Sequence, residues 1–399
     1  MNILKKLYCR IYQWAFHAAL PVLPYREPKI LRSVEEIASE IKNIKLKRIL
    51  IVTDEFLESS GATEVMKHSL EKSNIFYAVY DKTRPNPTVE NVEEALDMYK
   101  KHGCEGLIAF GGGSAIDCAK AVGARVVYPK RSIDSLKGTL KVFRKLPPLF
   151  AVPTTAGTGS EVTVTAVITD LQKKHKYTMN SFPFIPQFAV LDAKVTYSLP
   201  AHLTATTGMD ALTHAVESYI GRSTSRETRA LAEEAVKLIF ENIEIAYNEP
   251  KNYIARENML TAAYKAGIAF SKSYVGYVHA IAHSLGGEYN IPHGLANAVL
   301  LPVLLESYGE AVYKKLYNLA VYCNIADRID SEAEGAEKFI SRIKELNEKM
   351  GIPKKLSGIK AEDIPMMARY ADKEANPLYP VPVLMNAKEL EKYYYSIAE

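Results

Sequence analysis

The stretch GLIAFGGGSAIDCAKAVGARV, from Gly106 to Val126, joins a short apolar run, three consecutive glycines and a segment with helical periodicity. The apolar run is typical of a strand that is covered on both faces of its sheet. Consecutive glycines let the backbone approach a phosphate because no Cβ atom intervenes. A helix that begins near Ser114 would direct free N–H groups at that phosphate. The stretch predicts a strand–turn–helix unit, whose turn is either a phosphate site or a tight connection.

Comparable patterns occupy the chain on both sides of this stretch. They comprise strands over 48–54 and 75–81 and helices over 62–73 and 88–103. In the second of these helices, Thr88 is placed to cap the N-terminus and Gly103 to end the helix. Repeated strand–helix units with right-handed crossovers predict a parallel sheet within an α/β domain.

The pattern changes near residue 198, within the segment YSLPAHLTATTG. Beyond it β-branched runs are scarce, and helical periodicity dominates as far as the C-terminus. At about 100–200 residues per domain, a chain of this length is expected to form two domains. We predict an α/β domain over 29–198 and an all-helical domain over 199–399.

The first 28 residues are predicted to form an amphipathic N-terminal extension. Arg10, Gln13 and His17 interrupt its apolar residues, which argues against a signal peptide and against a membrane span. Pro21 and Pro24 end the helical segment. We expect this helix to pack on the body of the protein or on a partner subunit. Peripheral contact with a membrane is the alternative.

Composition excludes several classes of partner and scaffold. The formal net charge of +4, from 50 basic and 46 acidic residues, is too small and too evenly spread to indicate a nucleic-acid partner. The basic run from Lys173 to Lys176 is interpreted by default as a solvated turn. The four cysteines form no C-x-x-C pair, which argues against a disulfide scaffold or a four-cysteine zinc site. They suit a reducing compartment, and we expect a cytoplasmic protein.

Polar residues also follow two other predicted strands, where ligands bind in parallel sheets. Asp54 could bond a ribose 2′-hydroxyl and would repel a 2′-phosphate, which favours NAD over NADP, but it is equally suited to capping the next helix. PTTAGTGSEVT, from Pro153 to Thr163, is either a ligand loop rich in hydroxyl groups or an ordinary polar loop. Asp117 falls in the expected first turn of its helix, where capping competes with ligand contact.

Five metal-binding side chains occur in two later segments. MDALTHAVE places Asp210 and His214 four residues apart, and YVHAIAHSLGGEYNIPHG contains His279, His283 and His293. Residues at i and i+4 share one face of a helix. One carboxylate with neutral imidazoles suits Zn²⁺ or Fe²⁺. An open coordination position leaves room for only four of the five side chains, and spacing does not tell which one is excluded.

Four strings together resemble the iron-containing (group III) alcohol dehydrogenase family. They are GGGSAIDCAK, PTTAGTGSEVT, ATTGMDALTHAVESY and GYVHAIAHSLGGEYNIPHGLANAVLLP. The resemblance is strong from Arg48 to Pro302 and looser toward the C-terminus. It implies an α/β N-terminal dinucleotide-binding domain and an all-α C-terminal domain, the dehydroquinate synthase-like fold, with the active site in the cleft between them. It also implies a homodimer or a larger homo-oligomer.

The resemblance further implies roles for individual residues. The implied metal ligands are Asp210, His214, His279 and His293, and the implied proton-transfer residue is His283. The implied NAD(H) contacts are Asp54, Gly112, Gly113, Ser114, Asp117, Thr154, Thr155, Thr158 and Lys176. The metal would be Fe²⁺, alternatively Zn²⁺, acting as a Lewis acid in reversible hydride transfer between nicotinamide and a small primary alcohol, diol or aldehyde.

Two departures from the lactaldehyde-reducing members bear on the substrate. Thr165 stands where those members carry an asparagine, and DKEANPLYPVPVLM, from Asp372 to Met385, replaces their usual C-T-x-x-N-P-R ending. Alternatives are a glycerol- or hydroxybutyrate-type dehydrogenase on the same fold, or a metal-dependent hydrolase without redox chemistry. A hydrolase would leave the glycine turn and the threonine-rich loop without a role.

Overall fold

The computed structural model describes residues 1–19, 23–171 and 175–399. Residues 20–22, within the expected N-terminal extension, and Lys173 and Lys174, in the basic run, lie outside the described residues. The chain divides into two compact units. One is Pro24–Leu199, and the other combines Met1–Leu23 with Pro200–Glu399.

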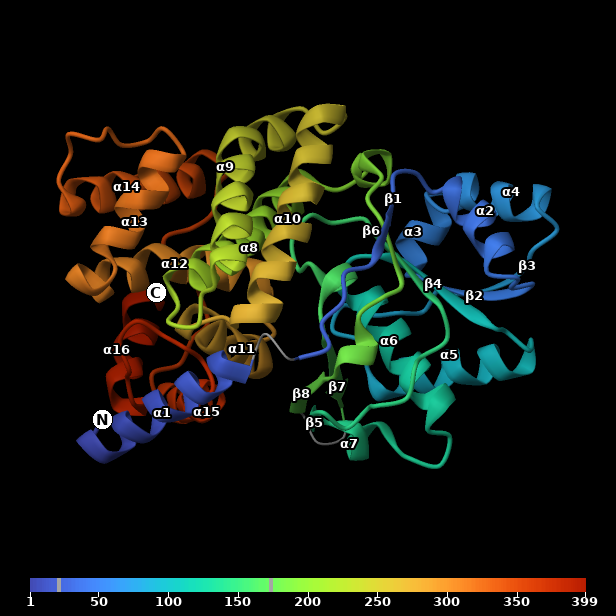
Figure 1. The fold of residues 1–399 in the computed structure, drawn as a ribbon, viewed down its shortest axis with the longest axis horizontal. Helices are drawn as coiled ribbons and strands as arrows, with labels where there is room; N and C mark the ends of the chain where they lie inside the picture. The colour runs from blue at the N-terminus through green and yellow to red at the C-terminus, as the bar shows by residue number, and fades with distance from the viewer. Residues whose placement is uncertain (20–22, 172–174) are drawn as a thin grey trace. The chain divides into compact units, whose positions relative to one another are not determined.

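The unit Pro24–Leu199 is built on a six-stranded sheet (Figure 1). Along the sheet the strands are β1 (Lys29–Leu31), β9 (Phe188–Val190), β6 (Leu149–Pro153), β4 (Gly106–Gly111), β2 (Arg48–Val52) and β3 (Phe76–Tyr80). Each neighbouring pair is parallel, which confirms the prediction made from the repeated strand–helix pattern.

Helices cover both faces of this sheet. They are α2 (Glu36–Asn43), α3 (Glu55–Ser59), α4 (Glu64–Lys72), α5 (Val89–Lys101), α6 (Gly113–Val127) and the short α7 (Ile133–Leu136). Successive side chains of a strand point to opposite faces. In β4, Leu107 and Ala109 therefore join the core that contains α5 and α6. Ile108 and Phe110 join the core that contains α2, α3 and α4.

The start and end of α5 follow the residues singled out in the sequence. Thr88 Oγ1 accepts a hydrogen bond from Asn91 N–H (3.2 Å), and the Asn91 side chain accepts one from Thr88 N–H (3.1 Å). This reciprocal capping box satisfies two N–H groups that the helix leaves without partners. Gly103, with φ of 59°, ends the segment in the left-handed region.

The strand order reverses between β2 and β4. From β2 the chain adds β3 on one side, and it then returns to place β4, β6 and β9 on the other side, where β9 pairs with β1 from the start of the unit. Crevices that bind ligands form at such reversals, outside the carboxyl ends of the strands. Asp54 follows β2 and the glycine turn follows β4, so both lie at this reversal.

A second, three-stranded sheet has the order β5-β8-β7. Its strands are β5 (Gly138–Thr139), β7 (Thr165–Asp170) and β8 (His175–Asn180). The repeated strand–helix pattern did not predict this separate sheet. β7 and β8 pair antiparallel because only four residues join them, whereas a parallel pair needs a crossover of a dozen or more.

The other unit is helical. Its longer helices are α8 (Ala201–Ile220), α9 (Arg226–Asn248), α10 (Tyr253–Ser273), α11 (Tyr277–Tyr289), α12 (His293–Tyr308), α13 (Tyr313–Tyr322), α14 (Glu332–Lys349), α15 (Ile364–Ala375) and α16 (Ala387–Ile397). Helix α8 packs against α9, α10 and α12, and nearly all its residues from Gly208 onward are buried. Polar side chains on this central helix are therefore enclosed.

The first helix, α1 (Ile3–Ala19), packs on the helical unit. Its buried residues are Cys9 and Gln13. Among the described residues, no single helix is both long and apolar enough to cross a membrane. The bent pair of His293–Ala311 and Tyr313–Tyr322 meets the requirement by length and composition alone.

Candidate metal centre and nucleotide site

Three helices of the helical unit bring four metal-binding side chains together. Asp210 and His214 lie one turn apart on α8, His279 lies in the first turn of α11, and His293 begins α12. One ligand atom from each residue lies within 4.8 Å of the other three. These are the four residues for which the family resemblance implies metal binding. His283 is not a member of the group.

The cluster fits a divalent metal ion. Four ligand atoms bonded to one ion at about 2.0–2.2 Å in a tetrahedral arrangement lie about 3.3–3.6 Å apart, so the widest separation in the cluster needs to close by about 1.2–1.5 Å. His279 Nε2 is buried, has no hydrogen-bond partner among the described residues and lies 3.8 Å from Asp210 Oδ1. Burial, together with the three neighbouring histidines, holds the pKa of His279 well below its usual value. Its imidazole is therefore neutral, which is the form that binds metals.

Glu217 supports this cluster, and the sequence reasoning missed it. The residue is buried on α8, one further turn along the face that carries Asp210 and His214. Its carboxylate accepts hydrogen bonds from Gly276 N–H (2.8 Å) and Val278 N–H (2.8 Å), and it lies 2.6 Å from His279 Nδ1. A hydrogen on Nδ1 leaves the lone pair on Nε2 for a metal, which is the usual arrangement around ligating histidines.

The surroundings of Glu217 explain both its position and its acidity. A Cβ atom on Gly276 would lie 2.5 Å from Glu217 Oε1, so only glycine lets the backbone approach the carboxylate this closely. Burial raises the pKa of Glu217 to about 7, against the opposing effect of the backbone N–H donors. The i, i+4, i+7 spacing in DALTHAVE could have identified this carboxylate from the sequence.

Asn297 holds another member of the cluster. It is fully buried on α12, one turn beyond His293. Its Nδ2 donates to Asp210 Oδ1 (2.7 Å) and lies 3.1 Å from His293 Nε2. The bond to a charged acceptor orients the Asp210 carboxylate toward the histidines. No spacing rule in the sequence pointed to this residue.

His283 lies beside the cluster and has a carboxylate partner of its own. Its ring stacks on that of His293 with centroids 5.0 Å apart. Its Nδ1 lies 2.6 Å from Glu374 Oε1, which also accepts a hydrogen bond from the Tyr379 hydroxyl (2.8 Å). Both partners come from DKEANPLYPVPVLM, the segment that departs from the lactaldehyde-reducing members. The departure therefore places a carboxylate and a phenol next to His283.

In the α/β unit, the glycine turn and the threonine-rich loop are in contact. Gly112 is the N-cap of α6, and it faces Thr155. A Cβ atom on Gly113 would lie 2.8 Å from Thr158 Oγ1 and Cγ2. The start of α6 and the hydroxyl groups of Thr155 and Thr158 therefore lie side by side, and we call this group of residues the cradle. Such a helix N-terminus binds phosphate without need of a charged side chain.

A buried lysine that the sequence reasoning passed over fixes the loop. Lys120 on α6 is fully buried, and its Nζ donates to Ser160 Oγ (3.0 Å), Thr163 O (3.1 Å) and Thr165 O (2.7 Å). Burial lowers its pKa to about 8, although Asp117 and Glu161 oppose the shift. The sequence signal is a lone lysine in the otherwise apolar run CAKAVGA.

The structure assigns Asp117 an internal role. Helix α6 begins at Gly113, so Asp117 falls in the second turn, and the expectation of a capping carboxylate in the first turn is wrong. Its Oδ1 accepts from Ser160 Oγ (2.6 Å) and its Oδ2 from Val167 N–H (2.9 Å). Burial raises its pKa. One carboxylate oxygen therefore binds the threonine-rich loop, and the other binds β7.

Asp54 caps the following helix, which is one of the two roles that the sequence allowed, the other being contact with a ribose hydroxyl. Its Oδ1 accepts from Leu57 N–H (2.9 Å) at the start of α3. Its Oδ2 faces the glycine turn, 3.8 Å from where a Cβ on Gly111 would stand. Capping uses one oxygen and directs the other toward the cradle.

The remaining predicted cofactor residues lie at or near strand ends. Ser114 Oγ accepts from Asn86 N–H (3.3 Å), which ties the start of α6 to the loop after β3. Thr154 is buried, and its N–H donates to Gly111 O (3.1 Å). Lys176 lies in β8, where partial burial lowers its pKa.

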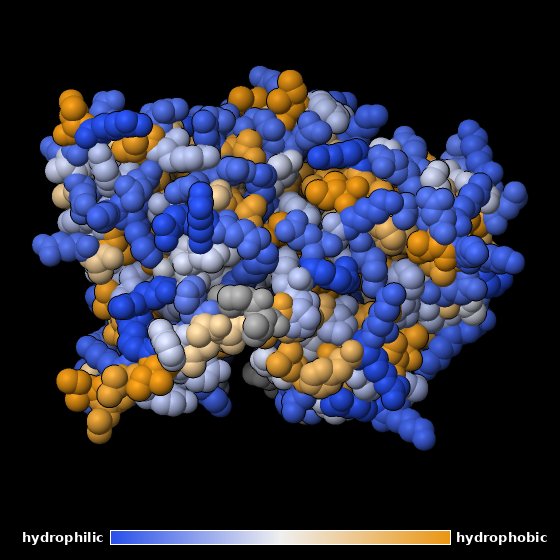
Figure 2. Space-filling model, viewed as in Figure 1, coloured by the Kyte–Doolittle hydropathy of each residue, from blue (hydrophilic) through white to orange (hydrophobic). Residues whose placement is uncertain are grey.

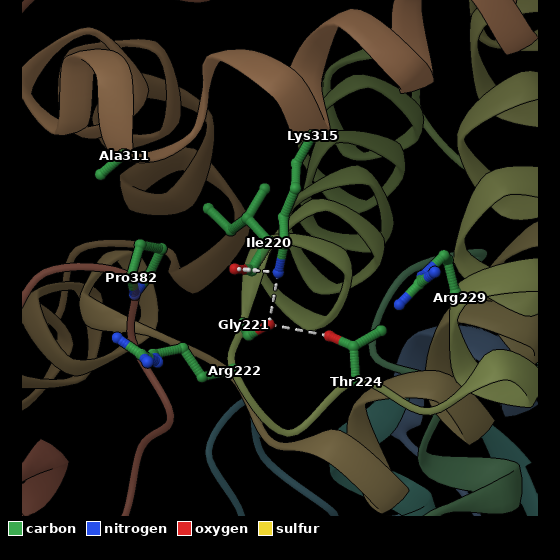
Figure 3. Close-up of a pocket in the computed structure, with 8 residues that line it drawn as sticks. All are labelled: Ile220, Gly221, Arg222, Thr224, Arg229, Ala311, Lys315 and Pro382. Atoms are coloured by element: carbon green, nitrogen blue, oxygen red, sulfur yellow. Dashed lines mark hydrogen bonds between the residues drawn. The ribbon is translucent and has the colours of Figure 1, made fainter. Parts of the chain in front are cut away.

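A pocket of about 360 Å³ lies elsewhere in the helical unit, lined by residues of the α8 C-terminus and its surroundings (Figure 3). Figure 3 shows Lys315 reaching the Ile220 and Gly221 carbonyls, to which Nζ donates at 2.9 and 2.7 Å. A lysine at a helix C-terminus satisfies carbonyls that lack partners within the helix. None of the candidate metal ligands lines this pocket, so it is separate from the candidate metal site. Its Lys315 caps the C-terminus of α8, the helix that carries Asp210 and His214.

A candidate phosphate site in one unit and a candidate metal site in the other are what a metal-dependent, nucleotide-linked dehydrogenase requires. The family model "Iron-containing alcohol dehydrogenase" matches residues 31–193. The family model "Fe-containing alcohol dehydrogenase family, C-terminal" matches residues 204–397. The chain belongs to the iron-containing alcohol dehydrogenase family, and it is an NAD-dependent oxidoreductase of that type.

Similar proteins agree with this assignment. The chain is 39% identical to a 1,3-propanediol dehydrogenase of Klebsiella pneumoniae over 340 residues, which cover 83% of this chain and 86% of that one. A solved 1,3-propanediol oxidoreductase superimposes with a TM-score of 0.89 at 35% identity, covering 93% of this chain and 98% of that one. Sulfoacetaldehyde reductase from Bifidobacterium kashiwanohense, solved with NAD⁺, superimposes with a TM-score of 0.84 at 30% identity, covering 94% of this chain and 98% of that one.

Proposed function

We propose that this enzyme interconverts a small primary alcohol or diol and its aldehyde at a metal held by Asp210, His214, His279 and His293. The observation that carries the proposal is the buried Nε2 of His279, which has no hydrogen-bond partner among the described residues and lies close to three other metal-binding side chains. Fe²⁺, or alternatively Zn²⁺, would supply Lewis acidity that lowers the pKa of an alcohol and polarises a carbonyl. Glu217 and Asn297 keep two of the ligands oriented toward it.

His283 is proposed to move the proton that accompanies hydride transfer. Its side chain is about one third exposed, so it connects the cluster with solvent. A hydrogen on Nδ1, bonded to Glu374, leaves Nε2 to accept a proton. The same carboxylate then stabilises the resulting imidazolium, since a hydrogen bond between charged groups is stronger than one between neutral groups.

The α/β unit is proposed to bind NAD(H) rather than NADP(H). The pyrophosphate would lie in the cradle of Gly112, Gly113 and Thr158 at the start of α6. Asp54 Oδ2 is available for the ribose 2′-hydroxyl and would repel a 2′-phosphate. Ser114, Thr154, Thr155 and Lys176 complete the proposed contacts. Asp117 would then act through the loop that it holds.

The substrate class follows from the departures and from the relatives. Of the relatives named above, one acts on 1,3-propanediol, a neutral diol, and one on sulfoacetaldehyde, as their names state. The carboxylate of Glu374 and the hydroxyl of Tyr379 sit beside His283. These groups favour a neutral substrate with a second hydroxyl over an anionic one, because a carboxylate repels anions. We also propose that the enzyme is a cytoplasmic homodimer or larger homo-oligomer.

The test uses protein stripped of metal and reloaded with Fe²⁺ or Zn²⁺. Short primary alcohols, diols and the corresponding aldehydes are offered with NAD(H) and NADP(H) in parallel, and absorbance of the reduced nicotinamide is followed. We expect turnover with NAD and a neutral alcohol. His214→Ala should lose both bound metal and turnover, whereas His202→Ala, an exposed histidine of the same helix, should retain both. Metal and turnover retained in His214→Ala would refute the ligand assignment, and a preference for NADP would refute the role of Asp54.

A further inference from the structure

Helix α1 contacts the helical unit mainly through polar side chains, alongside the buried Cys9 and the Phe16 ring, which packs against Tyr274. The Arg10 guanidinium donates to the carbonyls of Val381 (2.7 Å) and Pro382 (2.9 Å). The Gln13 amide donates to Pro377 (3.2 Å) and Tyr379 (2.7 Å). Lys5 also pairs with Asp372, the terminal amine with Glu389, and the His17 ring with Ser223. A helix bound to a protein core normally turns its apolar face inward, so α1 is oriented the other way round.

The apolar face of α1 points outward. Seven large side chains on it are between 41% and 82% exposed: Ile3, Leu4, Leu7, Tyr8, Ile11, Tyr12 and Trp14. Spacings of three and four residues place them along one side of the helix. Figure 2 shows their hydrophobic colour concentrated at the lower left, over α1. Contiguous exposed apolar patches of this kind mark interaction sites.

The charge around this face has one sign in the sequence. Residues 1–19 include Lys5, Lys6 and Arg10 and no aspartate or glutamate. Lys5 and the terminal amine are paired with acids of the helical unit, whereas Lys6 is exposed. Basic residues beside an apolar helix face are complementary to a surface of anionic lipids.

The composition of the face favours a membrane over a second copy of the chain. A standard protein interface takes about 20–30 residues from each partner, and this face offers seven large apolar side chains. Three of the seven, Tyr8, Tyr12 and Trp14, have amphipathic rings that prefer the boundary between lipid and water. We propose that α1 lies flat on an anionic membrane surface and anchors the enzyme there. This inference does not depend on the proposed substrate or site residues.

The only tryptophan of the chain, Trp14, lies on this face and provides a direct probe. The full-length protein is titrated with vesicles of phosphatidylcholine alone or with 30 mol% phosphatidylglycerol, and binding is followed by Trp14 emission and by sedimentation. We expect a blue shift and co-sedimentation with the anionic vesicles, both weakened by high salt. Neutral vesicles should bind less protein.

The double variant Leu7→Gln/Ile11→Gln keeps Trp14 as the reporter. Each replacement removes an apolar side chain worth about tenfold or more in partitioning, so binding should weaken about 100-fold or more. The control Ile254→Gln/Ile329→Gln changes two isoleucines that are also exposed but lie outside α1. It should bind as the original chain does, and both variants should keep dehydrogenase activity and circular dichroism.

Two results would overturn the proposal. One is vesicle binding that is absent or unchanged by the double variant. The other is an oligomer that forms without lipid and dissociates in the double variant, as measured by sedimentation velocity, with no binding to vesicles. That second outcome would assign the face to another copy of the chain.

Discussion

Replacing Glu217 by glutamine tests whether a carboxylate behind His279 sets the affinity of the metal centre. In the native protein, Oε2 accepts from both Gly276 N–H and His279 Nδ1, and Oε1 accepts from Val278 N–H. An amide has only one accepting oxygen. Whichever way it is turned, its NH₂ group faces at least one buried donor. The substitution therefore preserves the volume and breaks the hydrogen-bond pattern.

The size of the effect follows from these contacts. A buried donor without an acceptor costs about 1–3 kcal/mol, and part of this cost falls on His279, the ligand that Glu217 orients. Changes behind ligating histidines typically lower metal affinity about 10–100-fold. We expect a loss in this range, equivalent to about 1.4–2.8 kcal/mol in binding free energy.

The assay measures the dissociation constant for Zn²⁺ or Co²⁺ by competition with a chromophoric chelator, independently of turnover. Glu241→Gln, an exposed glutamate on the neighbouring α9, serves as the matched control and should bind metal normally. Circular dichroism and the urea midpoint of the metal-free proteins report whether the fold is intact. A folded Glu217→Gln protein with the original dissociation constant would refute the reasoning.

Three further predictions concern other charged side chains. Glu374→Gln should lower kcat about tenfold with an unchanged KM for NAD, because a neutral partner stabilises an imidazolium at His283 less than a carboxylate does. Lys120→Met should lower the free energy of unfolding in urea by about 2–5 kcal/mol and weaken NAD binding in calorimetry, since it leaves several buried acceptors of the threonine-rich loop without donors. Burial raises the pKa of Glu161 to about 7, so the folded state binds more protons than the unfolded state between about pH 4.5 and 7, and stability falls as pH rises through this window. In Glu161→Gln this fall, measured by urea titrations at several pH values, should be smaller by a few kcal/mol.

The first of these predictions has a matched control, and each has a contrary result. Glu362→Gln, an exposed glutamate just before α15, should leave kcat unchanged, and an unchanged kcat in Glu374→Gln would remove that residue from the mechanism. Equal urea midpoints for Lys120→Met and the original chain would show that the loop needs no lysine. An identical pH dependence in Glu161→Gln would contradict the raised pKa.

Some of these features were readable from local patterns. A helix or strand signal lies within a few residues, so the parallel sheet and the Thr88 cap followed from spacing alone. The paired spacing in MDALTHAVE and in YVHAIAH singled out the ligand-bearing helices for the same reason. Spacing did not select four ligands from five, since that choice depends on how α8, α11 and α12 meet.

The residues that escaped sequence reasoning make contacts far along the chain. Glu217 contacts His279 across 62 residues, and His283 meets Glu374 across 91. For Asp117, distant contacts replaced the role that its sequence position had suggested. Its position suggested a cap or a ligand contact, whereas its oxygens bind Ser160 and Val167. Local pattern cannot indicate such partners, because nothing in the spacing of either segment changes when they meet.

The sequence by itself determined the alternation of strands and helices in the α/β unit, the glycine turn, the candidate ligands and the amphipathic character of α1. Only the tertiary structure decided which side chains face each other: Glu217 behind His279, Lys120 beneath the loop, and the polar rather than the apolar face of α1 against the protein. Periodicity defines the two faces of a helix. The direction in which each face points depends on the hydrogen-bond partners that the rest of the fold presents, here the backbone carbonyls of residues 377–382.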